Sequence, residues 1–103
     1  MNDKLHSNQN DIITATNIAK LGKIVKIKLD YSKKSQLIHS IKITGDFFLH
    51  PEEAIERLEQ GLCGIKLEKE DLKNKIQIIL DDTEFFGFDI ESLVETIIKT
   101  KGD

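Results

Sequence analysis

The sequence predicts an α+β fold, a small antiparallel sheet (a β-hairpin) covered on one face by about three helices. Residues 23–44 carry two runs of alternating apolar and polar side chains around a short polar turn, the pattern of an antiparallel hairpin. Residues 51–102 then carry three segments whose apolar side chains recur at helical spacing. Because the strands precede the helices instead of alternating with them, the pattern favours α+β over a parallel α/β sheet.

The length and composition fit one domain of 103 residues. No apolar run approaches the ~20 residues of a membrane span. The first ten residues also lack the apolar stretch of a signal peptide. The single cysteine, Cys63, excludes an internal disulfide. These features predict a cytoplasmic protein without membrane contact.

The net charge of −3 is unevenly divided along the chain. Seven lysines and one acid lie between Lys20 and Lys42, whereas fifteen acids and seven bases lie between Asp46 and the end. A basic hairpin could meet a phosphate-bearing ligand or an acidic partner. Alternatively, its lysines form a solvated strand face that guards an exposed edge. No nucleic-acid-binding motif accompanies the charge, so we expect no nucleic-acid partner.

The hairpin strands are predicted at Lys23–Tyr31 and Leu37–Thr44. The second strand places four side chains in one phase: Leu37, His39, Ile41 and Ile43. Residues 1–10 are polar, and we expect them to be disordered. Residues 11–19 show no firm period and are either a lead-in ordered by a partner or a short extra strand or helix. The domain is therefore placed at residues 20–103, with residues 1–19 as lead-in.

The corner after the second strand joins a bend, two aromatic side chains and a helix start. Gly45 lets the backbone bend, and Asp46 either caps the turn or reaches a ligand or partner. Phe47 and Phe48 are predicted to be core and interface anchors. Pro51 suits the first position of a helix, which places Glu52 and Glu53 in its first turn, where the helix dipole favours acids.

The three helices are predicted from their apolar stripes and their ends. The first spans residues 51–62, with Gly64 closing it and Ile65 packing back. The second spans residues 69–80. Residues 85–88 form a short extended piece, Asp89 caps the third helix, and Gly102 ends it.

No catalytic or metal-binding set is visible in the sequence. The glycines do not form a phosphate loop, and no Ser-His-Asp arrangement can be built. His6, His39 and His50 are too scattered to join Cys63 in a zinc site. Cys63, between Leu62 and Ile65, is predicted to pack in the core. It lies near a helix C-terminus, where the helix dipole disfavours a reactive thiolate.

The run I-T-G-D-F-F followed by P-E-E-A-I-E-x-L-E resembles the C-terminal accessory domain of lipoate–protein ligases. The resemblance extends over residues 20–100 and includes a later F-x-G-x-D-x-E-x-L pattern, at Phe85, Gly87, Asp89, Glu91 and Leu93. Its weakest part is the lead-in K-L-G-K, which has Gly22 where the family often has a glycine pair. The resemblance implies a fold similar to the sulfur-transfer and iron–sulfur scaffold proteins.

The catalytic domain of that family carries an Arg-rich, triple-glycine motif, a downstream His-Asp and a lysine that holds lipoyl-adenylate, and this chain has none of them. The resemblance therefore implies the separate accessory subunit of a bipartite lipoate–protein ligase, without activity or bound cofactor alone. Its partner would be a large catalytic subunit, with which it uses lipoate and ATP/Mg to make lipoyl-AMP before transfer to a lysine of a lipoyl carrier domain. Six residues are candidate contacts to that partner or to its adenylate site: Lys20, Lys23, Gly45, Asp46, Phe47 and Phe48.

Two other functions stay open at this point. The first is a stand-alone sulfur acceptor, which would need Cys63 to be exposed and reactive. The second is a purely structural adaptor. An iron–sulfur scaffold is excluded, since it would need about three cysteines.

Overall fold

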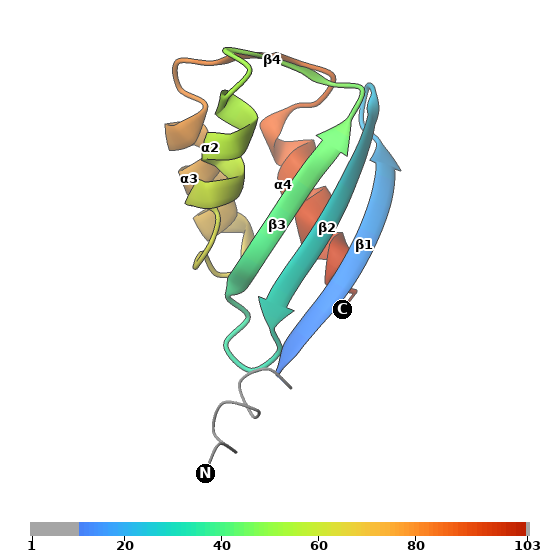
Figure 1. The fold of residues 1–103 in the computed structure, drawn as a ribbon, viewed down its shortest axis with the longest axis vertical. Coiled ribbons are helices and arrows are strands. Elements are labelled where there is room, and N and C mark those ends of the chain that lie inside the picture. The colour runs from blue at the N-terminus through green and yellow to red at the C-terminus, as the bar shows by residue number, and fades with distance from the viewer. Residues whose placement is uncertain (1–10, 103) are drawn as a thin grey trace.

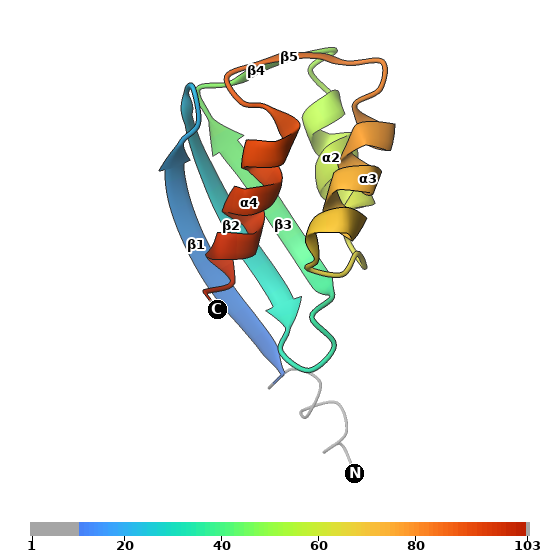
Figure 2. The same cartoon turned by 180° about the vertical axis from the view of Figure 1, so that it is seen from behind.

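The computed structural model describes residues 11–102, so the expectation of disorder for residues 1–10 lies outside the described residues. Figure 1 shows a twisted three-stranded layer with the helices behind it, and Figure 2 shows the helical side. The predicted α+β class, a small antiparallel sheet covered on one face by helices, is confirmed. The elements in chain order are β1 (Ile12–Lys20), β2 (Ile24–Ser32), β3 (Ile38–Gly45), β4 (Phe48–His50), α2 (Ala54–Gly61), α3 (Lys69–Ile79), β5 (Glu84–Phe86) and α4 (Ile90–Thr100).

The main sheet has the strand order β1-β2-β3, and both pairings are antiparallel. The predicted hairpin is β2–β3. Residues 12–20, left open between lead-in, strand and helix, form β1, which pairs with β2 along its whole length from Ile12↔Ser32 to Lys20↔Ile24. The boundary placed at residue 20 is therefore wrong, and the domain includes β1. The inward positions of β1 hold only half-buried and partly polar side chains, Asn17 among them, which weakened the alternating pattern.

Because of a β-bulge between Asp30 and Tyr31, the first residues of β3 face the opposite side of the sheet from the one predicted. Tyr31 pairs with Ile38 while Asp30 pairs with Ser40, so the residue between them, His39, has no partner in the register. Ile38 is consequently buried, whereas Leu37 and His39 are exposed. The predicted phase holds from Ile41 onward. It is wrong at Leu37 and His39, because the extra residue in the bulge reverses which side of the sheet the preceding residues face.

The core lies between the inner sheet face and the helices. α4 crosses β1 and β2, α2 packs against β3, and α3 packs against α2 and α4 (Figure 2). The Tyr31 hydroxyl donates to the carbonyl of Lys101 at 3.1 Å, which ties the sheet to the end of α4. None of the helices within residues 11–102 is long and apolar enough to cross a membrane. The largest fully buried side chains are Ile27, Leu29, Ile38, Leu58, Leu62, Leu72, Ile76, Leu93, Ile97 and Val25.

Two of the three helices follow the prediction closely. α3 ends one residue earlier than expected, and α4 begins after Asp89, whose carboxylate accepts from the backbone N–H of Ser92 at 2.8 Å. α2 starts at Ala54, so Pro51 is not its first residue. The extended chain continues through β4, and the cis bond between His50 and Pro51 follows before the helix can begin.

The outer edge of β3 is covered by the helical layer. The Glu59 carboxylate on α2 accepts a hydrogen bond from the backbone N–H of Ile43 at 2.8 Å. Ile38 exchanges backbone hydrogen bonds with Gly64 and Ile65, just after that helix. Gly64 has φ +85° and Ile65 packs against the core, as the sequence predicted.

Candidate functional site

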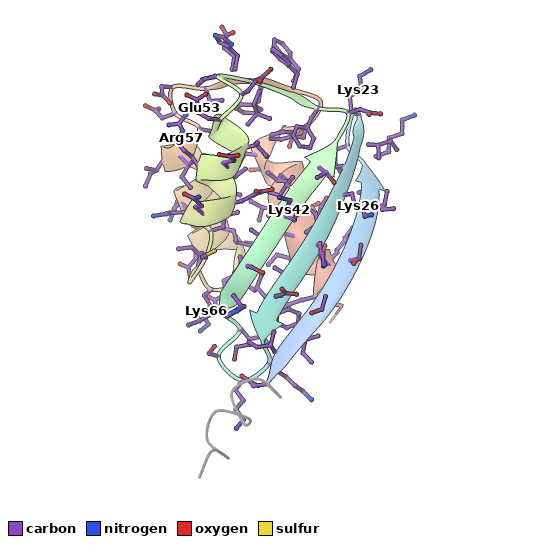
Figure 3. All side chains as sticks on the ribbon, in the orientation of Figure 1. Lys23, Lys26, Lys42, Glu53, Arg57 and Lys66 are labelled. Atoms are coloured by element: carbon purple, nitrogen blue, oxygen red, sulfur yellow. The ribbon has the colours of Figure 1, made fainter. Side chains whose placement is uncertain are left out.

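Three segments that are distant in the sequence meet at one end of the sheet (Figure 1). They are the β1–β2 turn, the β3–β4 bend and the β4–β5 ladder, which Figure 3 shows beside the labelled Lys23. The Lys23 backbone N–H donates to the carbonyl of Gly87 at 3.0 Å, which joins the turn to the segment after β5. We call this surface the aromatic end and define it by Lys23, Gly45, Asp46, Phe47, Phe48, Phe86 and Gly87.

Gly45 makes the tightest backbone contact at the aromatic end. Its φ is +149°, and a Cβ atom at this position would lie 2.1 Å from the carbonyl oxygen of Ile24. The next backbone N–H, of Asp46, donates to that same carbonyl at 3.0 Å. The bend predicted at Gly45 is therefore present, and it needs glycine for both its conformation and its space.

Phe47 is half-buried and packs against the core, as an anchor should. Its ring meets the ring of Phe88 edge to face, with the centroids 5.5 Å apart. Gly87 lies so close that a Cβ there would be 2.9 Å from the Cα of Phe47. Phe88 in turn stacks on Phe85 at 5.1 Å, so a chain of aromatic contacts joins the bend to the segment before α4.

Phe48 is exposed, so the prediction that it is a core anchor is wrong. The predicted role as an interface anchor is compatible with this exposure. Phe48 pairs with Phe86 across β4–β5, and the two rings stack with their centroids 6.2 Å apart. The exposed fractions are 51% for Phe48 and 64% for Phe86. A shallow hollow of about 230 Å³ lies beside Phe48, lined by Phe47, Phe48, Leu49, Glu52 and Ile55. Exposed aromatic pairs of this kind are favoured anchors in protein interfaces.

The charged candidates lie at the same end in different positions. Asp46 is exposed, and its carboxylate makes no hydrogen bond within residues 11–102, so the predicted turn cap is not formed. Lys23 belongs to the aromatic end through its backbone. Lys20 is the last residue of β1, and β2 separates it from the bend. The structure thus brings together five of the six predicted residues and leaves Lys20 on the neighbouring sheet face.

The sheet face turned away from the helices forms a second candidate surface. Alternation along the strands places four of the seven lysines of the basic hairpin there, and Figure 3 shows Lys26 and Lys42 on this side. Two exposed isoleucines, Ile18 and Ile24, lie on the same face. We call this surface the lysine face, defined by the outward residues Ile18, Lys20, Ile24, Lys26, Lys28 and Lys42.

Asp30 is the acid that joins the three strands on this outer face. Its two carboxylate oxygens accept hydrogen bonds from Thr14 on β1 at 2.7 Å and from Ser40 on β3 at 2.9 Å. The bond from Thr14 lowers the pKa of Asp30 below its ordinary value. Partial burial opposes this effect, and Ser40 and Lys28 add to it. The carboxylate is therefore ionised at neutral pH, and each of its oxygens accepts a hydrogen bond from a hydroxyl of a neighbouring strand.

Cys63 is exposed, so the prediction that it packs in the core is wrong. It follows the buried Leu62 just after α2, where consecutive side chains point in different directions, and its thiol donates to the carbonyl of Glu59 at 3.5 Å. Residues 11–102 contain no group of His, Cys, Asp and Glu side chains that could hold a metal ion.

Three residues of the two surfaces, Phe86, Ile18 and Ile24, were not among the candidates predicted from the sequence. The sequence signal for Phe86 is its place in the aromatic run from Phe85 to Phe88. Its pairing with Phe48 could not be predicted, because β4 and β5 have three residues each and are too short to show an alternating pattern. Ile18 gave no signal while β1 was unassigned. Both surfaces offer contact chemistry, apolar at one and cationic at the other.

Comparison with known proteins identifies a matching family and similar chains among the solved structures. The model of the family described as bacterial lipoate protein ligase C-terminus matches residues 12–97. A chain from the structure of an archaeal lipoylation system, a bi-partite lipoate protein ligase and its E2 lipoyl domain from Thermoplasma acidophilum, superposes with a TM-score of 0.73. The two chains are 25% identical, over 84% of this chain and 96% of the other. A comparison with curated proteins finds no match.

Proposed function

The chain belongs to the lipoate protein ligase C-terminal family, and from this premise we propose that it is the accessory subunit of a bipartite lipoate–protein ligase. In this proposal it acts in the cytoplasm with a separate catalytic subunit. The pair activates lipoate with ATP to lipoyl-AMP, and the lipoyl group then passes to a lysine of a carrier domain.

The observation that carries the proposal is the family match over nearly the whole described domain. The Thermoplasma acidophilum chain supports it, because that chain comes from a ligase described as bi-partite and is covered by this one over 96% of its length. The described residues offer contact surfaces and no metal-ligating cluster. The chemistry is therefore assigned to the partner, together with the binding of ATP and Mg²⁺.

We assign the contact with the catalytic subunit to the aromatic end. Stable subunit interfaces are more apolar than transient ones, and the exposed Phe48–Phe86 pair supplies such an apolar centre. Lys23 and Asp46 flank the pair with one charge of each sign, which would fix the orientation of docking. Gly45 and Phe47 hold the surface in shape from beneath.

The two halves of lipoylation differ in what they demand of the accessory subunit. Activation must align the lipoate carboxylate with the α-phosphate of ATP while the repulsion between the two anions is screened. An accessory subunit that closes over the site orders its loops and excludes water during that step. Transfer needs a positioned lipoyl-AMP and an incoming lysine amine, both of which the catalytic subunit can hold.

The partnership is tested by co-purification and light scattering. A tagged form of this chain should retain the catalytic subunit from a co-expression lysate and migrate with it as a complex of one copy each. Isothermal titration of the separately purified proteins should give a saturable isotherm. Independent migration of the two proteins at micromolar concentration, with no heat of binding, would contradict the proposal.

The exposure of Cys63 favours one second candidate, a sulfur-acceptor function. A persulfide carrier needs an accessible thiol, and Cys63 is accessible. Its thiol donates to the carbonyl of Glu59 at 3.5 Å, and the family match points to lipoylation instead. We therefore place this function second, and the Cys63→Ser variant separates the two.

A further inference from the structure

The lysine face carries a positive charge that the described part of the chain does not neutralise. Lys28 and Lys42 are direct cross-strand partners in the β2–β3 register. Like charges in that arrangement destabilise a sheet. None of the four lysines of the face makes an ion pair with another residue of the 11–102 range, whereas lysines of the helical side do.

Asp30, which lines the same hollow as Lys28 and Lys42, relieves this repulsion only in part. Asp30 accepts from Thr14 and Ser40 through its two oxygens, and its charge offsets only one of the neighbouring lysines. A shallow hollow of about 300 Å³ opens beside it, lined by Lys28, Asp30, Ser40, Ile41 and Lys42. An acidic side chain from outside would enter between Lys28 and Lys42 and lower their mutual repulsion.

From this arrangement, and resting on the proposed function, we infer that the lysine face docks the protein substrate, through an acidic surface of the lipoyl carrier domain. Charge complementarity selects an anionic partner. The exposed fractions of Ile18 and Ile24, 61% and 41%, select a protein over a nucleotide. These two side chains are diagonal neighbours on β1 and β2, and they offer an apolar contact that a phosphate group cannot use.

The character of the face also separates the carrier from the catalytic subunit. A carrier domain must arrive, react and leave in each catalytic cycle, and charged rims give fast, salt-sensitive association of that kind. The aromatic end, with its stacked rings, is the more apolar surface and suits the permanent partner. Lys28 and Lys42 lie toward the middle of β2 and β3, whereas the Phe48–Phe86 pair lies beyond the tip of the sheet, so an acidic side chain between these lysines leaves the pair free for the other partner (Figure 3).

The test compares two charge-reversal pairs with the same net charge. Lys28→Glu/Lys42→Glu reverses charges on the lysine face. Lys33→Glu/Lys34→Glu reverses the same number of charges in the β2–β3 turn, at the end of the sheet opposite the aromatic end. The probe is an unlipoylated E2 lipoyl domain, used with the reconstituted two-subunit enzyme. We expect the face pair to raise the KM for the lipoyl domain about tenfold, equivalent to ~1.4 kcal/mol, with kcat unchanged and the turn pair within about twofold of the parent. A milder pair, Lys28→Gln/Lys42→Gln, should give a smaller rise and guards against misfolding of the reversed pair.

Three outcomes overturn the inference. Equal effects of the two reversed pairs would show a general charge effect. An unchanged KM in the folded face pair would remove the face from substrate docking. Loss of lipoate-dependent pyrophosphate release in the face pair, measured without lipoyl domain, would assign the face to the catalytic subunit.

Binding of the lipoyl domain to the free protein can be measured even if the proposed ligase function is wrong. Titrating the ¹⁵N-labelled chain alone with the lipoyl domain should move amide resonances of β2 and β3 around Lys28 and Lys42, and added salt should reverse the shifts. ATP–Mg should leave those resonances unchanged. Shifts confined to the aromatic end, or none at millimolar lipoyl domain, would contradict docking at the lysine face. Absence of pyrophosphate release by the two wild-type subunits together would count against the ligase function and not against docking at the lysine face.

Discussion

Phe48 stacks on Phe86 across the β4–β5 ladder, and both rings remain more than half exposed, at 51% and 64%. Each ring contributes apolar surface that the fold does not bury, although Phe47 and Phe85 beside them pack against the core. Two partly buried rings therefore lie next to two exposed ones at this ladder. The exposed pair is free for a contact that the monomer does not make.

The first prediction concerns this pair. The double variant Phe48→Ala/Phe86→Ala should lose affinity for the catalytic subunit by ~2 kcal/mol or more, the scale of an interface hot spot. Its melting temperature should stay close to the parent value, because both rings are mostly exposed. Calorimetric titration measures the affinity, and Ile78→Ala, which truncates an apolar side chain that is 71% exposed on α3, is the matched control. Wild-type affinity in the double variant would remove the aromatic end from the interface.

Gly45 provides the second prediction. Gly45→Ala places a methyl group 2.1 Å from the Ile24 carbonyl oxygen, so the backbone of β2 or of the bend must shift. In Gly64→Ala, by contrast, the new methyl group meets no atom within 4 Å, and the cost is that of a positive φ alone. Urea unfolding should show Gly45→Ala to be less stable than Gly64→Ala by ~2 kcal/mol, the scale of overpacking. Equal stability of the two variants would contradict the close contact.

Asp30 gives the third prediction, a pH dependence of stability. Its pKa is lowered in the folded protein, first by the hydrogen bond from Thr14, so the unfolded chain binds the proton more readily. The stabilisation is therefore complete above the unfolded pKa of about 3.9 and is lost as the pH falls through the folded value. Unfolding free energies measured from pH 6 to pH 3 should decline more steeply for the parent than for Asp30→Asn. Parallel curves would show that the carboxylate contributes nothing to joining the strands.

Much of the fold could be predicted because local patterns specify it. The apolar stripes of α3 and α4 and the cap at Asp89 set those helices to within a residue or two. β2 alternates cleanly because its inner side chains, Val25 among them, are fully buried. β1 could not be assigned in this way, since an edge strand buries its inner side chains only in part.

Non-local pairing explains the remaining errors. The bulge opposite His39 depends on how β3 meets β2, and nothing in the local sequence marks it. The later start of α2 follows from β4 pairing with β5, whose residues lie more than thirty positions away. At the candidate site the sequence identified the bend at Gly45 and the rings that follow it. It could not identify Phe86 as the partner of Phe48, because that contact exists only once the ladder forms.

Cys63 provides the fourth prediction and separates the two candidate functions. Because the side chain is exposed and its thiol makes one long contact, Cys63→Ser should change the unfolding free energy by no more than about 0.5 kcal/mol. Lipoylation by the two-subunit enzyme should be unchanged, as measured by the mass shift of the carrier domain. Loss of activity in a folded Cys63→Ser protein would favour the sulfur-acceptor function instead.

The division of labour between the two subunits is the central claim, and lipoate-dependent pyrophosphate release tests it most directly. The catalytic subunit alone should release little pyrophosphate and still transfer the lipoyl group from synthetic lipoyl-AMP to the carrier. This chain alone should release none, and mixing the two proteins should restore release together with full lipoylation from lipoate and ATP. Pyrophosphate release at the full rate by the catalytic subunit without this chain would contradict the account.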